Sequence, residues 1–334
     1  MHNKRIYKFD NLKFLLILLV VIGHFADLYV SKYNSMRFIF IVIYSFHMPL
    51  FLFITGLFQK RINSFKDISL QKILFYIFLI YFMKISMFCV GKHYQSFSSF
   101  ELFSGTEGYW YLSVIIIYIL ILPIISKLKF SYILIFSLIM GLVVGYDNSI
   151  NDFLYLSRAI VFFPFYLLGY NYSNNKKKIL EITSNKKLKV ISIIIIIAFL
   201  CYCINNLDYI YRYRALFTGR NPYSYIADLN CTYKHRLLTY FISFIICFCI
   251  MCIIPNKKIK IITNLGKKTL QVYVLHQTII MFMNGIGLFN QLEKIFSDYF
   301  IYIYLLIAVM LTFFLSLRLF TKIFNYIKNT MFVN

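Results

Sequence analysis

The sequence is divided into ten long apolar runs, and this division constrains the fold more than any other feature of the chain. A helix needs about 20 mostly apolar residues to cross the hydrocarbon core of a bilayer. Charged residues make up only 14% of the 334 residues, too few to cover a water-facing surface. The sequence therefore predicts an all-α, polytopic integral membrane bundle of about ten helices. The expected spans lie near residues 12–31, 37–59, 70–90, 109–126, 130–146, 154–172, 187–206, 235–254, 264–284 and 298–320.

The basic residues predict how these spans are oriented. If the N-terminus is inside, 24 of the 35 Lys and Arg residues fall in cytoplasmic segments and nine fall outside. The other two, Lys84 and Arg158, lie within spans. This alternation predicts that both termini are cytoplasmic. We interpret the net charge of +23 as a positive-inside signal rather than a nucleic-acid-binding surface, and we expect a multi-pass protein of the plasma membrane.

We expect residues 1–334 to form a single transmembrane domain without an SGNH hydrolase or other soluble domain, and the first apolar run to be a retained signal anchor. The longest stretch between spans, 207–234, is predicted to face outward and is rich in Tyr and Arg. It is typical either of an interfacial aromatic belt or of a surface that contacts a sugar or an anion, and composition leaves both open. The seven cysteines lie mostly in or beside apolar runs. This placement indicates that they serve as small apolar residues of membrane helices rather than forming a disulfide framework or a metal site.

Three histidines, His24, His47 and His276, lie about 15 to 18 Å deep in their spans, near the middle of the bilayer. Ionisable residues at that depth are costly and mark candidate functional sites. Lys13 and His24 are eleven residues apart, so they project from one helix face about 16 Å apart along the axis. This spacing suits a long anionic ligand that enters from the cytoplasm, although Lys13 could equally be a snorkelling topology residue. Asp27 can reach the same face and orient the imidazole of His24.

Five segments resemble, in the same order, motifs of the acyltransferase family 3 membrane proteins. The segment SFHMPLFLFITG at 45–56 is similar to the FHMPLFFFISG segment of the branch described as fucose 4-O-acetylase-like. Lys13 and His24 match the hallmark of the family, which is Arg or Lys, ten residues, and then His. Lys13 stands where many members have Arg, and Thr55 and Thr269 stand where Ser is common. The five segments are FDNLKF at 9–14 with LVVIGH at 19–24, SFHMPLFLFITG at 45–56, YWYL at 109–112, FPFYLLG at 163–169 and LGKKTLQVYVLH at 265–276.

The resemblance implies transfer of an acyl group, usually acetyl, from cytosolic acetyl-CoA to a sugar hydroxyl of a cell-envelope or exported polysaccharide. Acetyl-CoA is then the donor substrate, and no cofactor is permanently bound. The other expected partners are a glycan or lipid-linked sugar and membrane lipid, while a homo-oligomer stays open. The chemistry agrees with this inference, because acyl transfer to a hydroxyl needs a base near neutral pH, oxyanion stabilisation and exclusion of water.

We assign provisional roles on this basis. His24 is the expected catalytic residue, either as a general base or as a transient acyl carrier. His47 is the expected second catalytic residue, either orienting His24 or stabilising the oxyanion. Asp27 orients the imidazole, whereas His276 is expected to be structural. Lys13 and Asp10 are expected at the CoA entrance, with Asp10 capping the first span or holding the entry loop. The residues expected to contact the acceptor are Trp110, Arg158, Arg212 and Arg214.

Two other classes of function remain open beside the acyltransferase. One is a transporter or flippase for glycan precursors that uses the midplane histidines as a proton relay. The other is a structural subunit of a polysaccharide export complex. A thioester-dependent acylation assay distinguishes them. Whether the acceptor is modified at the external face, or as a lipid-linked sugar at the inner face before export, is also left open.

Overall fold

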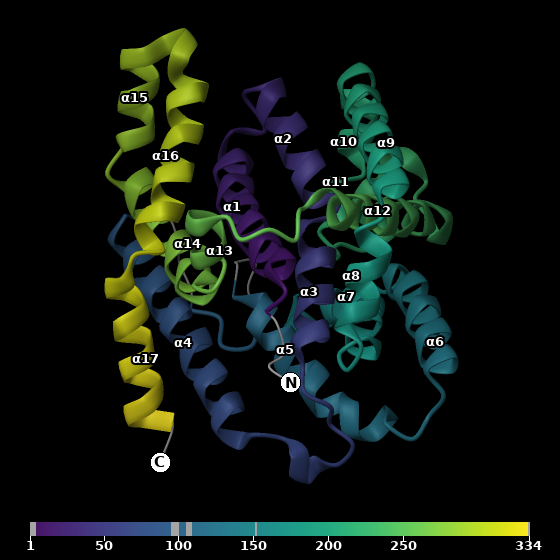
Figure 1. Cartoon of the computed structure of the whole chain (residues 1–334). Helices are drawn as coiled ribbons and strands as arrows, with labels where there is room; N and C mark the ends of the chain where they lie inside the picture. Colours follow the sequence, from purple (N-terminus) through teal and green to yellow (C-terminus); the bar gives the residue numbers. More distant parts are fainter. Residues whose placement is uncertain (1–4, 95–99, 105–108, 151, 333–334) are drawn as a thin grey trace.

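The computed structural model describes residues 5–94, 100–104, 109–150 and 152–332, and within these ranges it contains helices and no β-strand (Figure 1). The longer helices are α1 (Tyr7–Tyr29), α2 (Asn34–Tyr44), α3 (His47–Phe58), α4 (Leu70–His93), α5 (Trp110–Ile125), α6 (Phe130–Val143), α7 (Leu156–Asn171), α9 (Lys186–Asn205), α12 (Tyr233–Ile253), α14 (Thr269–Gly285), α15 (Leu288–Phe296), α16 (Phe300–Leu315) and α17 (Arg318–Phe332). The short elements are α8 (Lys176–Thr183), α10 (Leu207–Arg212), α11 (Arg214–Phe217), α13 (Lys260–Leu265) and the 3-10 turns η1 (Phe65–Asp67), η2 (Val144–Tyr146), η3 (Phe153–Tyr155), η4 (Tyr223–Leu229) and η5 (Ser297–Tyr299).

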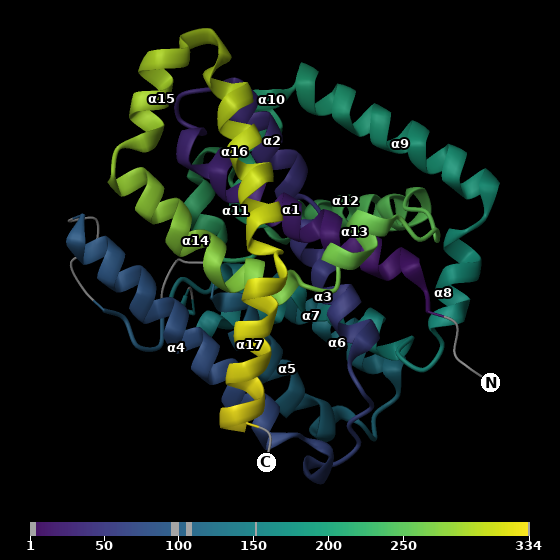
Figure 2. The ribbon, with the colours of Figure 1, turned by 60° about the vertical axis from the view of Figure 1, so that its left-hand side comes forward.

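Every predicted span overlaps at least one of these helices, which confirms the all-α membrane bundle. Among the described residues, seven helical segments are long and apolar enough to cross a membrane, and two shorter apolar helices, Trp110–Ile125 and Phe130–Tyr146, accompany them. The number of crossings and the cytoplasmic placement of the termini stay predictions. Helix α1 lies in the middle of the bundle and packs against α2, α3, α14 and α16 (Figures 1 and 2).

Contacts between loops agree with the predicted alternation of sides. The buried ammonium of Lys8 donates to the carbonyls of Thr183 and Met251 at 2.8 and 2.9 Å. The start of α1 therefore contacts a segment predicted to be cytoplasmic and the predicted cytoplasmic end of the span 235–254. At the other end, Arg37 pairs with Asp208 at 3.5 Å, and both residues are predicted to face outward. Segments expected on one side therefore contact each other.

The second predicted span is interrupted, which the continuous apolar run did not reveal. Helix α2 ends at Tyr44 and α3 begins at His47. The Phe46 carbonyl accepts from the Leu50 N–H at 2.9 Å and from the Cys247 thiol at 3.5 Å, whereas the Ser45 carbonyl accepts from the Ser243 hydroxyl of α12 at 2.6 Å. A broken helix inside a membrane needs such partners. The break places His47 at a helix start within the bundle.

Helices α3 and α7 pack against each other more extensively than any other pair of elements in the described part of the chain, and two glycines permit their close approach. A Cβ atom on Gly56 would lie 2.2 Å from the carbonyl oxygen of Tyr166, and one on Gly169 would lie 1.9 Å from that of Phe53. Small residues let membrane helices approach this closely. The glycines that end two of the family-like segments are therefore explained by packing rather than by chemistry.

Candidate active site

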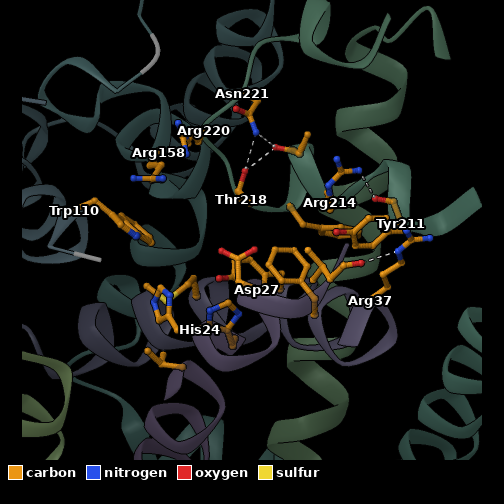
Figure 3. A pocket seen from close by; sticks show the side chains of 18 of the residues that line it. His24, Asp27, Arg37, Trp110, Arg158, Tyr211, Arg214, Thr218, Arg220 and Asn221 are labelled. Atoms are coloured by element: carbon orange, nitrogen blue, oxygen red, sulfur yellow. Dashed lines mark hydrogen bonds between the residues drawn. The ribbon is translucent and has the colours of Figure 1, made fainter. Parts of the chain in front are cut away.

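A cavity of about 550 Å³ lies beside the second half of α1, and six of the predicted site residues line it (Figure 3). Its walls come from α1, α2, α3, α5, α7, α14 and the segment from α10 to η4. We call it the outer cavity, because the sequence predicts this end of α1 to face outward. The six predicted residues are His24, Asp27, His47, Trp110, Arg158 and Arg214.

His24 is paired with His276, which the sequence did not predict. Their ring centroids lie 5.2 Å apart, with the rings inclined at 46°. His276 is fully buried, and its Nδ1 lies 3.0 and 2.8 Å from the carbonyl oxygens of Val272 and Tyr273. Because carbonyls only accept, Nδ1 of His276 carries the hydrogen and Nε2 is left as an acceptor. This Nε2 is buried and has no hydrogen-bond partner among the described residues.

His47 is held in the same tautomer. Its Nδ1 lies 2.8 Å from the carbonyl oxygen of Ile43, across the break between α2 and α3. Its ring also contacts Tyr44 edge-on at 4.8 Å. The backbone therefore orients His47 with Nε2 free to accept a proton, and both His47 and His24 line the outer cavity.

Asp27 lines the same cavity one turn beyond His24, and it is exposed to the cavity space (Figure 3). No hydrogen bond joins Asp27 to His24 in the described part of the chain. Its role in orienting the imidazole stays a prediction. The partner that the geometry brings against the His24 ring is His276.

Trp110 and Arg158 form one unit in the cavity wall across from His24 (Figure 3). The Arg158 guanidinium lies 5.1 Å from the Trp110 ring centre, and Trp110 stacks on Phe162 at 5.6 Å. Arg158 and Arg220 both approach the carboxylate of Asp152, at 3.7 and 2.8 Å. The aromatic face thus holds Arg158 in place while leaving part of its guanidinium to the cavity.

The segment 207–234 folds over the outer cavity instead of forming a belt at the surface alone. Tyr211, Arg214 and Asn221 all line the cavity. Arg212, which the sequence also placed at the acceptor, is exposed and does not line it.

A second cavity, of about 430 Å³, lies beside the first half of α1, and we call it the inner cavity. Asp10 and Lys13, the two residues expected at the CoA entrance, both line it. Asp10 does not cap α1, because the N-cap residue Ile6 precedes it and no side chain caps the helix. Asp10 is instead buried and bonds to Arg5 at 2.7 Å, which raises the pKa of Arg5. The Lys13 ammonium lies 4.0 Å from Asp10 and 4.1 Å from the Phe58 ring centre.

Tyr273 lines both cavities, so the two lie on either side of this side chain. Tyr111 packs against Tyr273 at 5.4 Å and against Phe51 at 5.3 Å. The Tyr111 hydroxyl also bonds to that of Thr55 at 2.5 Å. We call Phe51, Thr55, Tyr111 and Tyr273 the aromatic neck.

Several residues of the two cavities were not predicted from the sequence. Arg37 and Arg220 line the outer cavity, and both belong to the small set of basic residues that the topology places outside. Basic residues on the outer side oppose the positive-inside rule, and this was the sequence feature from which Arg37 and Arg220 could have been identified. Tyr111 and Tyr273 each lie inside a family-like segment, but aromatic residues in apolar runs have no distinguishing pattern. Among the described residues, no group of three or more His, Cys, Asp or Glu side chains could hold a metal ion.

A family model described as an acyltransferase domain matches residues 6–327 of the chain. No curated protein and no solved structure matches.

Proposed function

Because this chain belongs to acyltransferase family 3, whose model covers residues 6–327, we propose that it transfers an acetyl group from cytosolic acetyl-CoA to a sugar hydroxyl of a cell-envelope or exported glycan. Family membership makes the chain an acyltransferase, and its apolar helices make it a membrane protein. The donor, the acceptor and the location in the plasma membrane belong to the proposal.

One observation carries the proposal: the two cavities lie along α1 and share Tyr273, with Lys13 in the inner cavity and His24 in the outer one. A donor bound in the inner cavity can present its thioester at the aromatic neck. An acceptor in the outer cavity can present a hydroxyl to His24 from the other side. The arrangement separates the two substrates and joins them at one point.

The inner cavity suits the anionic end of acetyl-CoA. Its lining contains four cationic side chains and one carboxylate, that of Asp10. Lysine ammonium groups are flexible point charges that can follow a phosphate chain. The cationic residues of the inner cavity are Arg5, Lys13, Lys72 and Lys267.

The proposed reaction is a direct acyl transfer. The neutral imidazole of His24 takes the proton of the acceptor hydroxyl while the hydroxyl oxygen bonds to the thioester carbonyl carbon. The C–S bond then breaks, the proton passes from the imidazole to the sulfur, and CoA leaves as the thiol. His276 orients the His24 ring through their ring contact. His47, which the Ile43 carbonyl orients, donates a hydrogen bond to the oxyanion when its Nε2 is protonated. In a covalent variant, a ring nitrogen of His24 bonds to the carbonyl carbon, the C–S bond breaks, and CoA takes the other ring proton and leaves as the thiol. The acceptor oxygen then bonds to the carbonyl carbon, the C–N bond breaks, and the hydroxyl proton returns to the imidazole.

The test uses the purified chain in lipid nanodiscs with acetyl-labelled acetyl-CoA and envelope glycan. We expect labelled ester on the glycan and free CoA in equal amounts. Label trapped on the protein without acceptor would assign the covalent variant. A transporter would move glycan across vesicles without consuming acetyl-CoA, and that result would replace the proposed function. Ester analysis of the envelope glycan with and without the gene extends the test to the cell.

A further inference from the structure

The outer cavity is lined by more positive than negative charge. One carboxylate, that of Asp27, lines it together with four guanidinium groups. Two of the four share a single partner, since Asp152 lies 3.7 Å from Arg158 and 2.8 Å from Arg220. The four are Arg37, Arg158, Arg214 and Arg220.

The remaining two arginines are weakly neutralised. Arg37 pairs with Asp208, whose side chain is 88% exposed, so solvent screens this pair. Arg214 lies on the Tyr211 ring at 4.5 Å, and no carboxylate lies within 4.0 Å of it in the described part of the chain. The cavity therefore keeps a positive charge that its own carboxylates do not balance.

Arg158 is a buried cation whose pairing is incomplete. It is only 5% exposed, and its Nη1 lies 3.7 Å from Asp152 Oδ1 but makes no hydrogen bond with any described residue. A buried guanidinium is costly unless its donors are paired. Arg236 is paired more fully, because both of its Nη atoms donate to carbonyls, those of Leu216 and Asn221 at 2.6 and 3.2 Å, and among its described contacts only the Nε has no partner. Arg158 lacks this arrangement and lies at a cavity wall.

We propose that Arg158 and Arg220 bind an anionic group of the acceptor, so that the acylated sugar carries a phosphate or a carboxylate. This inference rests on the proposed function only in taking the outer cavity as the acceptor site. The two guanidinium groups lie on the wall opposite His24 and Asp27, so an anion held there leaves a neighbouring hydroxyl toward the imidazole (Figure 3). Arginine forks pair with both phosphate and carboxylate oxygens, and they fix the orientation of the bound group.

Trp110 provides a direct reporter, because it is the single tryptophan of the chain and lies against Arg158. The full-length protein in nanodiscs of neutral lipid is titrated with inorganic diphosphate, glucuronate or glucose, without acetyl-CoA. We expect a saturable change in Trp110 fluorescence with one of the anions and none with glucose at the same concentrations. Diphosphate as the stronger ligand identifies a phosphate-bearing acceptor, and glucuronate identifies a uronic or other acidic sugar.

Variants then locate the site. Arg158→Gln and Arg220→Gln should each weaken anion binding about tenfold or more, because each removes a charge-assisted hydrogen bond. Arg158→Lys should recover part of the affinity. Arg212→Gln, which changes an exposed neighbour outside the cavity, and Lys13→Ala, in the inner cavity, should leave anion binding unchanged.

Three results would overturn the inference: equal fluorescence changes with glucose and the anions, no saturable change with either anion, or anion binding that survives both glutamine variants. Because the titration requires no turnover, it can succeed even where acetyl transfer is not the activity. Acetyl transfer to neutral sugars only, with no anion binding, would instead keep the proposed function and reject the anionic acceptor.

Discussion

The inner and outer cavities are both cationic, but they use different cations. Three of the four basic residues that line the inner cavity are lysines, whereas all four that line the outer cavity are arginines. Lysine offers a flexible, strongly hydrated point charge, and arginine offers a rigid planar fork. The inner cavity is thus suited to hold a long, flexible polyanion, while the outer cavity is suited to fix the orientation of a compact group.

The two cavities also differ in what surrounds their charges. In the inner cavity, the buried Asp10 lies between Arg5 and Lys13. In the outer cavity, the guanidinium groups of Arg158 and Arg214 lie on aromatic rings. From this contrast we expect that substitutions in the inner cavity change the affinity for the donor, and substitutions in the outer cavity change the orientation of the acceptor. The predictions below test whether the two effects are independent.

The largest effect is expected from His24→Ala, which acts at the outer cavity alone. Removing a general base should lower the rate of acetyl transfer by about 10²- to 10⁴-fold. Affinity for acetyl-CoA should remain, because Lys13 and the inner cavity are unchanged. Turnover and donor binding are measured on the same preparation, with His93→Ala as the control at an exposed histidine. Substantial residual turnover would refute the assignment of His24.

Gly169→Ala should disturb both cavities together, because α3 carries His47 toward one and Thr55 toward the other. The added methyl group would lie 1.9 Å from the Phe53 carbonyl oxygen, and forced overpacking costs about 1 to 3 kcal/mol. We expect a lower unfolding temperature and a loss of both donor and acceptor binding. Gly23→Ala, whose methyl would meet a Tyr44 ring atom at 3.2 Å, should change the unfolding temperature less. An unaltered Gly169→Ala protein would mean that the helices can separate without cost.

Lys13→Ala should affect the inner cavity alone. We expect acetyl-CoA affinity to fall about tenfold, because one charge-assisted contact to phosphate is lost. Anion binding in the outer cavity should not change. Lys178→Ala removes an exposed lysine from a predicted cytoplasmic segment and serves as the matched control. Equal acetyl-CoA affinity in the two variants would assign Lys13 to membrane topology only.

The smallest effect is expected at the aromatic neck, between the two regions. Thr55→Val keeps the side-chain shape but removes the bond to the Tyr111 hydroxyl. A neutral hydrogen bond contributes about 1 kcal/mol, so we expect a change of about fivefold in the ratio of acetyl-CoA hydrolysis to acetyl transfer. Thr330→Val removes a comparable helix hydroxyl from the exposed face of α17 and should not change this ratio. An unchanged ratio in Thr55→Val would mean that the neck does not separate water from the thioester.

The helical architecture could be read from the sequence, because apolar length alone requires helices in a membrane. The break before His47 could not, since the run from 37 to 59 is mostly apolar and the side chains that hydrogen-bond to the backbone at the break come from α12, some 200 residues away. Helix α15 was also missed, because its polar residues resemble a loop between spans.

The candidate site was predictable only in part. Lys13 and His24 share one helix, so their relation follows from helical periodicity. The contact between His24 and His276 depends on how α14 is rotated against α1, which a single sequence does not specify. The position of Asp152 between Arg158 and Arg220 also depends on how the chain packs, which a single sequence does not specify.

The central claim is that donor and acceptor reach the site from opposite ends of α1. The most direct test reconstitutes the protein with one orientation in sealed vesicles and supplies labelled acetyl-CoA and the glycan acceptor on the same side or on opposite sides. Our account predicts ester formation when acetyl-CoA is on the Lys13 side and the acceptor is on the other. Ester formation only when both substrates share the Lys13 side would contradict it and would place acylation before export of the glycan.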